Sequence, residues 1–310
     1  MSLALPPMLV VAGATATGKT GLAIDVALAL RGRGIPAEVI SADSRQVFRG
    51  LDIGTAKVSV ADRRGVPHHG LDLVEPDGAF SVADFVRHAR GVLGSIAAQG
   101  GVAILAGGTG LYLRAVARGL DTDALPSDPD LRAMIEAQLA AGGLAPAVER
   151  LRTLAPRLAA RIDTANPRRV ARALEIAELR GDAPPPPPLG YDAPVAWLGL
   201  RVEPPTHAEW IATRARQQFD AGLIEEARAL RERFDPGLPA FSAIGYRESW
   251  AVLDGELTRE AAIELDARRN LQFARRQATW FRSEPGIEWL DAAAAPLPRA
   301  LEVAQQLLAG

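Results

Sequence analysis

The residues best suited to chemistry form a glycine-rich segment near the start of the chain, Gly13-Ala14-Thr15-Ala16-Thr17-Gly18-Lys19-Thr20. This segment has the pattern G-x-x-x-x-G-K-[ST] of a phosphate-binding loop, or P-loop. Its glycines allow several backbone N–H groups to point at one anion at a helix N-terminus. Lys19 adds a positive charge, and the Thr20 hydroxyl can ligate Mg²⁺ bound to the phosphates. The pattern predicts a site for a di- or triphosphate.

The segments beside this loop favour its use as a phosphate site. An apolar run, Met8–Ala12, precedes the loop and is typical of a buried strand, and residues Thr20–Leu30 have the pattern of a helix. The alternative is a glycine-rich turn that binds nothing. The order strand, loop, helix favours the phosphate site.

A second polar segment, Ser41-Ala42-Asp43-Ser44-Arg45-Gln46, follows the next predicted strand, Ala37–Ser41. Ligands of open α/β sheets bind at the carboxyl ends of strands, so we expect Asp43 to face the P-loop. Its carboxylate would serve beside Mg²⁺ or as a general base. The structural alternative is the N-cap of a following helix.

The third predicted strand, Val102–Ala106, ends in Gly107-Gly108-Thr109-Gly110. Nucleoside-triphosphate hydrolases normally carry an acidic residue there to hold Mg²⁺ and to order water. Its absence argues against an ordinary ATPase or GTPase and favours an unusual phosphate substrate. The pair His68-His69 suggests a metal site, but adjacent side chains rarely reach one ion and no third ligand is evident, so the sequence favours the alternative that the pair binds no metal.

The order of elements predicts an α/β fold class, with a P-loop NTPase-like parallel sheet core flanked by helices. Residues 1–119 form the first part of this core, and residues 120–189 form an all-helical insertion. Residues 190–310 supply a return strand at Ala196–Val202 and a helical C-terminal region. The run Pro184–Pro188 favours a stiff surface connection over a partner motif. The other predicted helices are Ala83–Ala98 and Leu111–Arg118.

The composition is that of a globular protein, with 48% hydrophobic residues, 23% charged residues and a net charge of −2 over 310 residues. Cysteine is absent, which excludes disulfides and thiolate metal sites. No segment is typical of a membrane span or a signal peptide, and we expect a cytoplasmic protein. The acidic average does not exclude RNA, because a local group of arginines suffices to bind its phosphates.

Two groups of arginines fit such a role. Arg168, Arg169 and Arg172 share one helix face. Near the C-terminus, arginines at nearly two-turn spacing form a stripe with interleaved aromatic residues and no nearby acids: Arg268, Arg269, Arg275, Arg276 and Arg282, with Phe273, Trp280 and Phe281. The alternative is a set of solvated helix arginines. Nearby stackable aromatics favour an RNA backbone.

Taken together, these motifs resemble the tRNA dimethylallyltransferase (isopentenyl-tRNA transferase) family over nearly the whole chain. The segments that carry the resemblance are Gly13–Thr20, Ser41–Gln46, Gly50–Lys57, Val66–His69, Gly107–Tyr112, Arg169–Glu175, Ile244–Glu248 and Arg275–Arg282. The P-loop alone is shared with many proteins. Asp-Ser-x-Gln, Asp-Ile-Gly-Thr-Ala-Lys and Arg-Gln-x-Thr-Trp-Phe-Arg in this order are far more specific.

The resemblance implies transfer of a dimethylallyl group from dimethylallyl diphosphate to N6 of the adenosine 3′ to a tRNA anticodon. It implies catalytic roles for Asp43 as general base, for Thr109 near the reacting amine and for Arg214 at the diphosphate. It also implies Mg²⁺ as cofactor, on Thr20, with the P-loop stabilising the leaving diphosphate. The reacting base must be flipped out of its stack.

The resemblance also implies tRNA as partner, with helical residues 120–189 facing it, and we expect a monomer. The implied tRNA contacts are Asp43, Ser44, Arg45, Gln46, Arg168, Arg169, Val170, Ala171, Arg172, Arg275, Arg276 and Arg282. Four positions depart from the family: Arg168 stands where Gln is frequent, Asn270-Leu271 replaces Thr-Arg, and Trp210 stands where Arg is frequent. Without cysteine, the chain resembles the shorter, bacterial form.

Three other functions stay open at this point. Transfer to free AMP or ADP would need neither the insertion nor the two arginine groups. A small-molecule kinase would consume ATP. A non-catalytic RNA-binding protein would carry the P-loop as a vestige.

Overall fold

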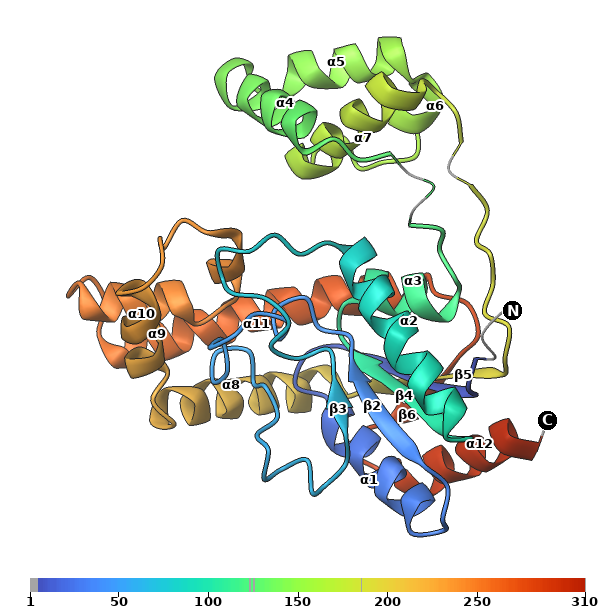
Figure 1. Ribbon diagram of the computed structural model, residues 1–310. Helices are drawn as coiled ribbons and strands as arrows, with labels where there is room; N and C mark the ends of the chain where they lie inside the picture. Colours follow the sequence, from blue (N-terminus) through green and yellow to red (C-terminus); the bar gives the residue numbers. More distant parts are fainter. Residues whose placement is uncertain (1–4, 123, 125, 185, 310) are drawn as a thin grey trace. The chain divides into compact units, whose positions relative to one another are not determined.

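The structure is a computed structural model and describes residues 5–122, 124, 126–184 and 186–309. The chain forms two compact units (Figure 1). The first, which we call the core unit, comprises residues 1–119 and 190–310, and the second, the helical unit, comprises residues 120–189. Pro185, within the predicted polyproline connection, lies outside the described residues, and its described neighbours belong to no helix or strand.

The core unit contains a six-stranded sheet in which all paired strands are parallel. Its order is β3-β2-β4-β1-β5-β6. The strands are β1 (Met8–Gly13), β2 (Ala37–Ser41), β3 (His68–His69), β4 (Val102–Gly107), β5 (Val195–Arg201) and β6 (Ile287–Asp291). The predicted α/β class with a parallel sheet is confirmed. Strands β3 and β6 were not predicted, because the first is very short and the second lies in a mostly helical region.

Helices cover both faces of the sheet, and this explains why every residue of β1 and β4 is buried. On one face, α1 (Lys19–Arg31) and α12 (Leu297–Ala309) bury an apolar cluster with Leu9, Val11 and Leu198. Helices α2 (Val82–Ala98) and α3 (Gly110–Ala117) pack against each other and against β4. Figure 1 shows α2 and α3 apart from α1 and α12, with the strands between them.

A second helical layer follows β5 in the sequence. It consists of α8 (Pro204–Asp220), α9 (Leu223–Arg231), the 3-10 turn η1 (Pro239–Ser242), α10 (Tyr246–Leu253) and α11 (Arg259–Arg282). Helix α11 packs on α8 and α10 and contacts β1 and α3. This long helix therefore reaches from the second layer to the P-loop strand (Figure 1).

The helical unit has an apolar core of its own. It contains α4 (Pro129–Gly142), α5 (Leu144–Leu154), α6 (Pro156–Ala159) and α7 (Pro167–Arg180). Asp128 and Asn166 cap α4 and α7, each with a proline in the first turn. At its centre Glu175 is fully buried and accepts hydrogen bonds from Arg132 and from the Asp128 N–H. Burial alone would raise the pKa of Glu175, but these hydrogen bonds and that of Arg172 lower it.

Candidate active site

The P-loop connects β1 to α1 and contains backbone conformations that require small residues. Gly18, the N-cap of α1, has φ +81°. Gly13 has φ +144°, and a Cβ there would lie 2.7 Å from the Leu200 carbonyl oxygen of the neighbouring strand. Thr17 is buried, and its hydroxyl donates to the Ala14 carbonyl oxygen over 2.9 Å. The loop is thus preformed.

The Lys19 ammonium lies inside this loop and donates to the Ala14 carbonyl oxygen over 2.5 Å. Burial lowers the pKa of Lys19 to about 8, against the opposing effect of Asp43 and together with the repulsion of Arg214. The cation is held by a neutral carbonyl group. It therefore remains available to pair with an anion that enters the loop.

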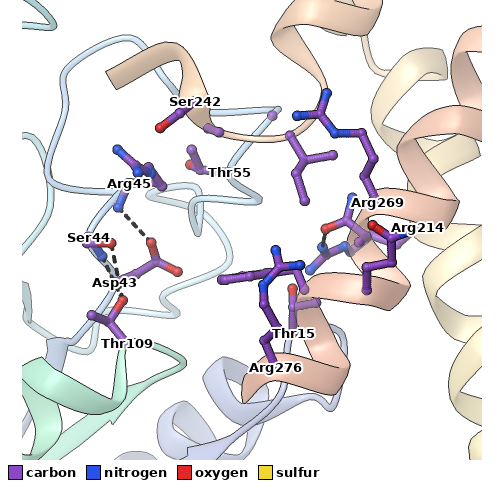
Figure 2. Close-up of a pocket in the computed structure, with 16 residues that line it drawn as sticks. Thr15, Asp43, Ser44, Arg45, Thr55, Thr109, Arg214, Ser242, Arg269 and Arg276 are labelled. Atoms are coloured by element: carbon purple, nitrogen blue, oxygen red, sulfur yellow. Dashed lines mark hydrogen bonds between the residues drawn. The ribbon is translucent and has the colours of Figure 1, made fainter. Parts of the chain in front are cut away.

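Asp43 follows β2, as predicted, but no helix begins there, so the N-cap alternative is wrong. Residues 44–47 form a turn, and Asp43 Oδ1 accepts the N–H of Arg45 at 2.8 Å and that of Gln46 at 3.4 Å. This is the arrangement of an Asx-turn. In the described part of the chain, Asp43 Oδ2 accepts no hydrogen bond. Figure 2 shows the carboxylate directed into a cavity.

Thr109 follows β4 and lies beside Asp43. Its Oγ1 accepts the Ser44 N–H at 3.0 Å, and its own N–H donates to the Ala42 carbonyl oxygen at 3.1 Å. Gly107 permits this approach, since a Cβ there would lie 2.1 Å from the Ala42 oxygen. The ends of the two neighbouring strands are thereby joined, which fixes Thr109 relative to Asp43.

Arg214 reaches the same site from α8. Its guanidinium donates to Asn270 Oδ1 over 3.1 Å, and burial lowers the pKa of Arg214 while Asp266 and Asp43 raise it. Figure 2 shows Arg214 on the opposite side of the cavity from Asp43 and Thr109. The three residues that the sequence assigned to catalysis are therefore brought together by three different elements.

The cavity between these side chains measures ≈ 300 Å³ and is also lined by Thr15 of the P-loop and by Phe273 of α11. A second, more open cavity of ≈ 800 Å³ is lined by Thr20 and, again, by Arg214. The Thr20 hydroxyl is on an exposed residue at the start of α1. Arg214 therefore lines both cavities, one on the Asp43 side and one on the Thr20 side.

Two residues that the sequence analysis did not assign hold the peptide groups of Thr15. The Thr15 N–H donates to Gln277 Oε1 over 2.8 Å, and its carbonyl oxygen accepts from His207 Nε2 at 2.8 Å. Gln277 Nε2 donates in turn to the Gly108 carbonyl oxygen over 2.9 Å. Gln277 is buried, although Arg275 and Arg276 precede it in the sequence. A glutamine directly after two arginines is a signal by which the sequence analysis could have found this residue. No sequence signal pointed to His207.

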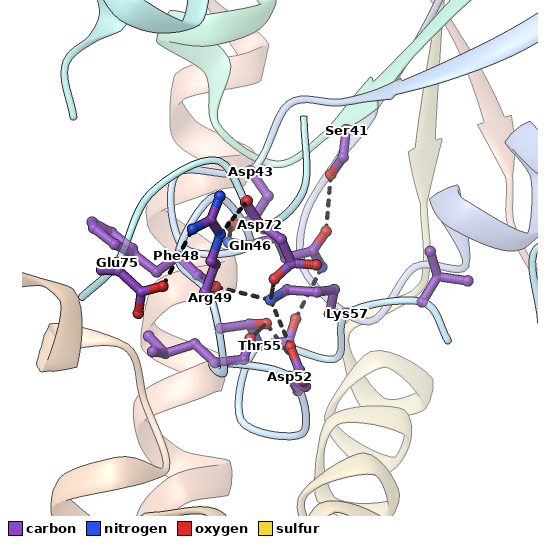
Figure 3. A network of polar contacts seen from close by, with 12 residues as sticks. Ser41, Asp43, Gln46, Phe48, Arg49, Asp52, Thr55, Lys57, Asp72 and Glu75 are labelled. Carbon is purple, nitrogen blue, oxygen red and sulfur yellow. Dashed lines mark hydrogen bonds and ion pairs between the residues drawn. The ribbon is translucent and has the colours of Figure 1, made fainter. Parts of the chain in front are cut away.

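The segment Leu51–Lys57 forms a wall of both cavities and is fixed by a network of polar contacts (Figure 3). Lys57 Nζ donates to Asp52 and Asp72 at 2.6 Å and to the Phe48 carbonyl oxygen at 2.8 Å. Only 4% of the Lys57 side chain is exposed. With its three N–H groups used, this lysine holds the loop and is not free to bind substrate.

The same segment, Leu51–Lys57, is also held by a residue of α9, an arrangement that we call the clamp. One carboxylate, that of Glu226, accepts the N–H groups of three successive residues, at distances of 3.3, 2.8 and 3.2 Å for Asp52, Ile53 and Gly54. It also accepts the Tyr246 hydroxyl at 2.8 Å. The N–H groups of residues 52–54 are therefore all hydrogen bonded to this one carboxylate.

The histidine pair has two separate sets of partners. His69 Nε2 lies 2.7 Å from Glu38 Oε2, whereas His68 Nδ1 lies 2.8 Å from the Val66 carbonyl oxygen. Successive residues of a strand point to opposite faces. Within the ranges that the structure describes, no group of three or more histidine, cysteine or acidic side chains could hold a metal ion.

The residues beside Asp43 that the sequence analysis expected to contact tRNA have different partners in the structure. Gln46 is used internally, since its amide accepts from Ser41 Oγ at 2.9 Å and donates to the Thr55 carbonyl oxygen at 3.0 Å. Arg45 reaches the Pro239 carbonyl oxygen of η1 over 3.0 Å and, like Ser44, lines the ≈ 300 Å³ cavity.

The arginine stripe lies on α11, with Arg268, Arg275, Arg276 and Arg282 exposed. Arg276 lies 5.7 Å from the centre of the Phe273 ring and lines the cavity. Two parts of the predicted pattern are wrong. Arg269 has an acidic neighbour, because it pairs with the buried Glu248 of α10, and Phe281 is buried and does not interleave with the exposed arginines.

The predicted tRNA contacts on α7 include both exposed arginines and buried apolar residues. Arg168 and Arg169 are exposed at its first turn, and their N–H groups donate to the Asn166 cap. Val170 and Ala171 have buried side chains in the core of the helical unit. Arg172 pairs with Glu175 at 2.7 Å, so part of its charge is already compensated.

Comparisons with known proteins show which family this chain is similar to. The family model described as IPP transferase matches residues 46–284. This chain belongs to the IPP transferase family. It is 42% identical over 286 residues to a protein named tRNA dimethylallyltransferase from Thermobifida fusca, covering 91% of this chain and 89% of that protein. A protein of the same name from Anaeromyxobacter dehalogenans is 42% identical over 296 residues, with 91% and 94% covered.

Solved structures give the same relationship. The tRNA isopentenylpyrophosphate transferase from Bacillus halodurans superposes with a TM-score of 0.70 at 36% identity, covering 97% of this chain and 95% of that one. Among the described residues, every helix is too short or too polar to cross a lipid bilayer.

Two positions that depart from the family can now be placed. Leu271 is partly buried and packs with Ala14 of the P-loop, Ile211 and Ala274. A charged side chain here would have to leave this apolar cluster. Trp210 lies half-buried on α8, and nothing in the structure explains its replacement of arginine.

Proposed function

We propose that this protein transfers the dimethylallyl group of dimethylallyl diphosphate to N6 of the adenosine 3′ to the anticodon of a tRNA. The observation that carries the proposal is the ≈ 300 Å³ cavity, which Asp43, Thr109, Arg214 and Thr15 line together. A carboxylate, a hydroxyl group and a cation thus surround one space at the P-loop. Membership of the IPP transferase family and relatives named tRNA dimethylallyltransferase support the same activity.

The donor's diphosphate fits the positive end of the site. The P-loop N–H groups at the start of α1, together with the Lys19 ammonium and the Arg214 guanidinium, oppose its negative charge. The leaving diphosphate gains charge as the C–O bond breaks, so these groups stabilise the transition state more than the bound substrate. Gly107 ends β4 and Gly108 follows it, where a hydrolase would carry an acid, and this supports a substrate other than ATP.

Asp43 would accept the proton of the adenine amine. The new C–N bond forms from N6 to the dimethylallyl carbon, the C–O bond to diphosphate breaks, and the N6 proton passes to Asp43 Oδ2. Support for this role comes from the two backbone N–H groups that hold Oδ1 and leave Oδ2 directed into the cavity. Thr109, fixed by the Ser44 N–H, has a hydroxyl group within the same lining to orient the amine.

The residues present fit Mg²⁺ at the Thr20 side. Mg²⁺ prefers oxygen ligands, keeps several waters and is bound largely by substrate phosphates, so one protein hydroxyl suffices. The exposed Thr20 hydroxyl, at the edge of the ≈ 800 Å³ cavity, offers that ligand. When bound there, Mg²⁺ would neutralise part of the diphosphate charge.

The acceptor adenine would enter the cavity from the side of α11. Base stacking on aromatic rings and arginine planes is the usual way to hold an extruded base, and Phe273 and Arg276 offer both. The exposed Arg168, Arg169, Arg275 and Arg282 would contact phosphates.

The experiment that tests this function is incubation of the protein with Mg²⁺, dimethylallyl diphosphate and unmodified tRNA, followed by nucleoside mass spectrometry. We expect N6-isopentenyladenosine at the position 3′ to the anticodon. Replacing tRNA by AMP should give no product. Prenylation of AMP at a comparable rate, or consumption of ATP without a prenylated nucleoside, would contradict the proposal.

A further inference from the structure

Arg214 is a partly buried arginine of α8 that packs against α11, and no carboxylate among the described residues accepts a hydrogen bond from it. In the described part of the chain, Asn270 of α11 is the one side chain that accepts a hydrogen bond from its guanidinium, over 3.1 Å. A neutral amide holds a cation less firmly than a carboxylate does. The position of Arg214 between the two cavities therefore depends on how well Asn270 is itself held.

Asn270 is buried, 7% exposed, and is held by Asp266 one helical turn earlier. Its Nδ2 donates to Asp266 Oδ1 over 2.7 Å and to the Asp266 carbonyl oxygen over 3.2 Å. These two bonds fix the amide so that Oδ1 faces Arg214. Asp266, Asn270 and Arg214 thus form a continuous chain from α11 to α8.

Asp266 is 1% exposed, and its charged neighbours come from every helix packed around it. Glu248 lies on α10, Arg269 on α11 itself and Arg214 on α8. Gly245, before α10, leaves room for the carboxylate, since a Cβ there would lie 3.1 Å from Asp266 Oδ2. Glu248 is already paired with Arg269, so Asp266 is left with Asn270 and, through it, with Arg214.

We propose that Asp266 acts through Asn270 as a positioning residue for Arg214, holding the guanidinium ready for the donor's diphosphate. The proposal rests on the proposed function for the identity of the donor. The ionised carboxylate polarises the Asn270 amide, so that Oδ1 becomes a stronger acceptor for Arg214. It also offsets part of the cost of burying the guanidinium before any anion has bound.

The protein holds this carboxylate at a cost to its own stability. Burial and the charge of Glu248 raise the pKa of Asp266 to about 6, against the opposing effects of Asn270, Arg214 and Arg269. Because the folded state binds this proton more tightly than the unfolded chain does, the stabilisation from Asp266 is full below about pH 4. It is lost as pH rises through about 6.

The test compares the wild type with Asp266→Asn, which keeps the shape and an acceptor for Asn270 but removes the charge. We expect about tenfold weaker binding of inorganic diphosphate in Mg²⁺-containing buffer at pH 8, measured by calorimetry. Inorganic diphosphate itself titrates, so the ratio of the two affinities is the readout. That ratio should approach one as pH falls below about 6, where Asp266 is protonated in the wild type.

Stability provides the second readout. Asp266→Asn should not lower the thermal midpoint at pH 8, because the variant buries no charge. A lower midpoint at pH 8 together with unchanged diphosphate affinity would overturn the proposal and leave Asp266 a purely structural residue. A control is Glu284→Gln, which removes a buried carboxylate paired with Arg114 and Arg118 outside both cavities. This control should lower the midpoint and leave diphosphate affinity unchanged.

Asn270 is tested by a matched pair of variants. Asn270→Ala removes the acceptor and should weaken diphosphate binding about tenfold, whereas Asn270→Thr restores a hydroxyl acceptor and should recover most of it. Equal affinity in all three proteins would contradict the proposal. Because inorganic diphosphate is the probe, failure of the prenyl transfer to tRNA would be seen separately and would count against the proposed function alone.

Discussion

At the scale of the single residue, three charged groups of the site are each held by a neutral partner. Lys19 donates to the Ala14 carbonyl group, Arg214 to the Asn270 amide, and Asp43 accepts the N–H groups of Arg45 and Gln46. An ion pair within the protein would have to break before the substrate could bind. Neutral partners orient these charges without cancelling them, which is the preorganisation that catalysis requires.

The role of Asp43 predicts a large loss of rate on Asp43→Asn. The amide keeps the shape of the carboxylate but cannot accept the proton from N6, so we expect single-turnover prenyl transfer to fall by roughly 10²- to 10⁴-fold. The assay is rapid-quench product formation at saturating substrates. Binding of inorganic diphosphate, measured in parallel, should stay within about twofold. A rate near that of the wild type would contradict the general-base role.

The lowered pKa of Lys19 predicts uptake of a proton when the donor binds. The pKa of Lys19 is lowered to about 8, so before the donor binds its side chain is mostly the neutral amine at pH 9. An arriving diphosphate favours the charged form and raises this pKa. Calorimetry in two buffers of different ionisation enthalpy should show uptake of up to about one proton at pH 9 and almost none at pH 6.5. Lys19→Met should abolish the uptake.

The lowered pKa of Lys19 also predicts how the stability of the folded protein changes with pH. Between about pH 8 and the ordinary value of 10.5, the unfolded chain binds more protons at Lys19 than the folded protein does. The contribution of Lys19 to stability therefore increases as pH rises through this range, and Lys19→Met should remove this increase.

At the scale of elements, α11 joins two kinds of function in one helix. Its buried face presents Asp266, Asn270, Ala274, Gln277 and Phe281, at spacings of three or four residues, to the other helices and to the P-loop. Its exposed face carries the arginines. One helix therefore contacts the P-loop through Gln277 and presents arginines on its outer face, where we propose that they contact phosphates.

The exposed face of α11 predicts a salt-dependent loss of tRNA binding in Arg275→Ala, which removes one of the expected phosphate contacts. Each phosphate contact adds slightly less than one unit to the slope of log affinity against log salt concentration, so this variant should reduce the slope by about one. Filter binding or fluorescence anisotropy over a range of salt concentrations measures it. Arg299→Ala on α12, an arginine paired with Glu288, is the control and should leave the slope unchanged.

The clamp of α9 on the segment Leu51–Lys57 predicts a stability effect. Glu226→Ala leaves the N–H groups of residues 52–54 and the Tyr246 hydroxyl without their acceptor. We expect the free energy of unfolding to fall by about 2–4 kcal/mol in chemical denaturation. Glu225→Ala, an exposed neighbour on the same helix, should change it by less than about 0.5 kcal/mol. Equal losses in the two variants would exclude the clamp.

At the scale of the whole molecule, strand order determines where chemistry takes place. Strands β2, β4 and β1 are neighbours in the sheet, so their carboxyl ends bring Asp43, Thr109 and the P-loop to one edge. The helical unit is inserted after α3 and returns before β5. A Cβ on Gly119 would lie 1.9 Å from the Gly190 carbonyl oxygen, so the two ends of the insertion meet.

This meeting of the ends predicts that the core unit folds without the insertion. Joining Gly119 to Gly190 through a few glycine and serine residues should give a protein that unfolds cooperatively and binds inorganic diphosphate with nearly wild-type affinity. It should bind tRNA more weakly, since Arg168 and Arg169 are lost. Thermal unfolding and calorimetry test the first two outcomes. Loss of folding would show that the core unit needs the helical unit.

Much of this protein is determined by local sequence. The P-loop, the strands β1, β2, β4 and β5 and the approximate bounds of α1, α2 and α3 follow from short apolar runs, glycines and caps, because those signals act within a few residues. The predicted positions of Asp43 and Thr109 follow from one general rule, that parallel strands present their carboxyl ends at one edge.

Only the tertiary structure decided the rest. Arg214, Asn270 and Asp266 meet because α8 packs on α11, and Gln277 and His207 reach Thr15 from residues far along the chain. The ion pair of Arg269 with Glu248 likewise joins two helices. The physical reason is that such contacts depend on packing between distant segments. The sequence alone determined which groups could perform the chemistry, and the packing determined which of them are held, which are buried and which remain free to meet the substrate.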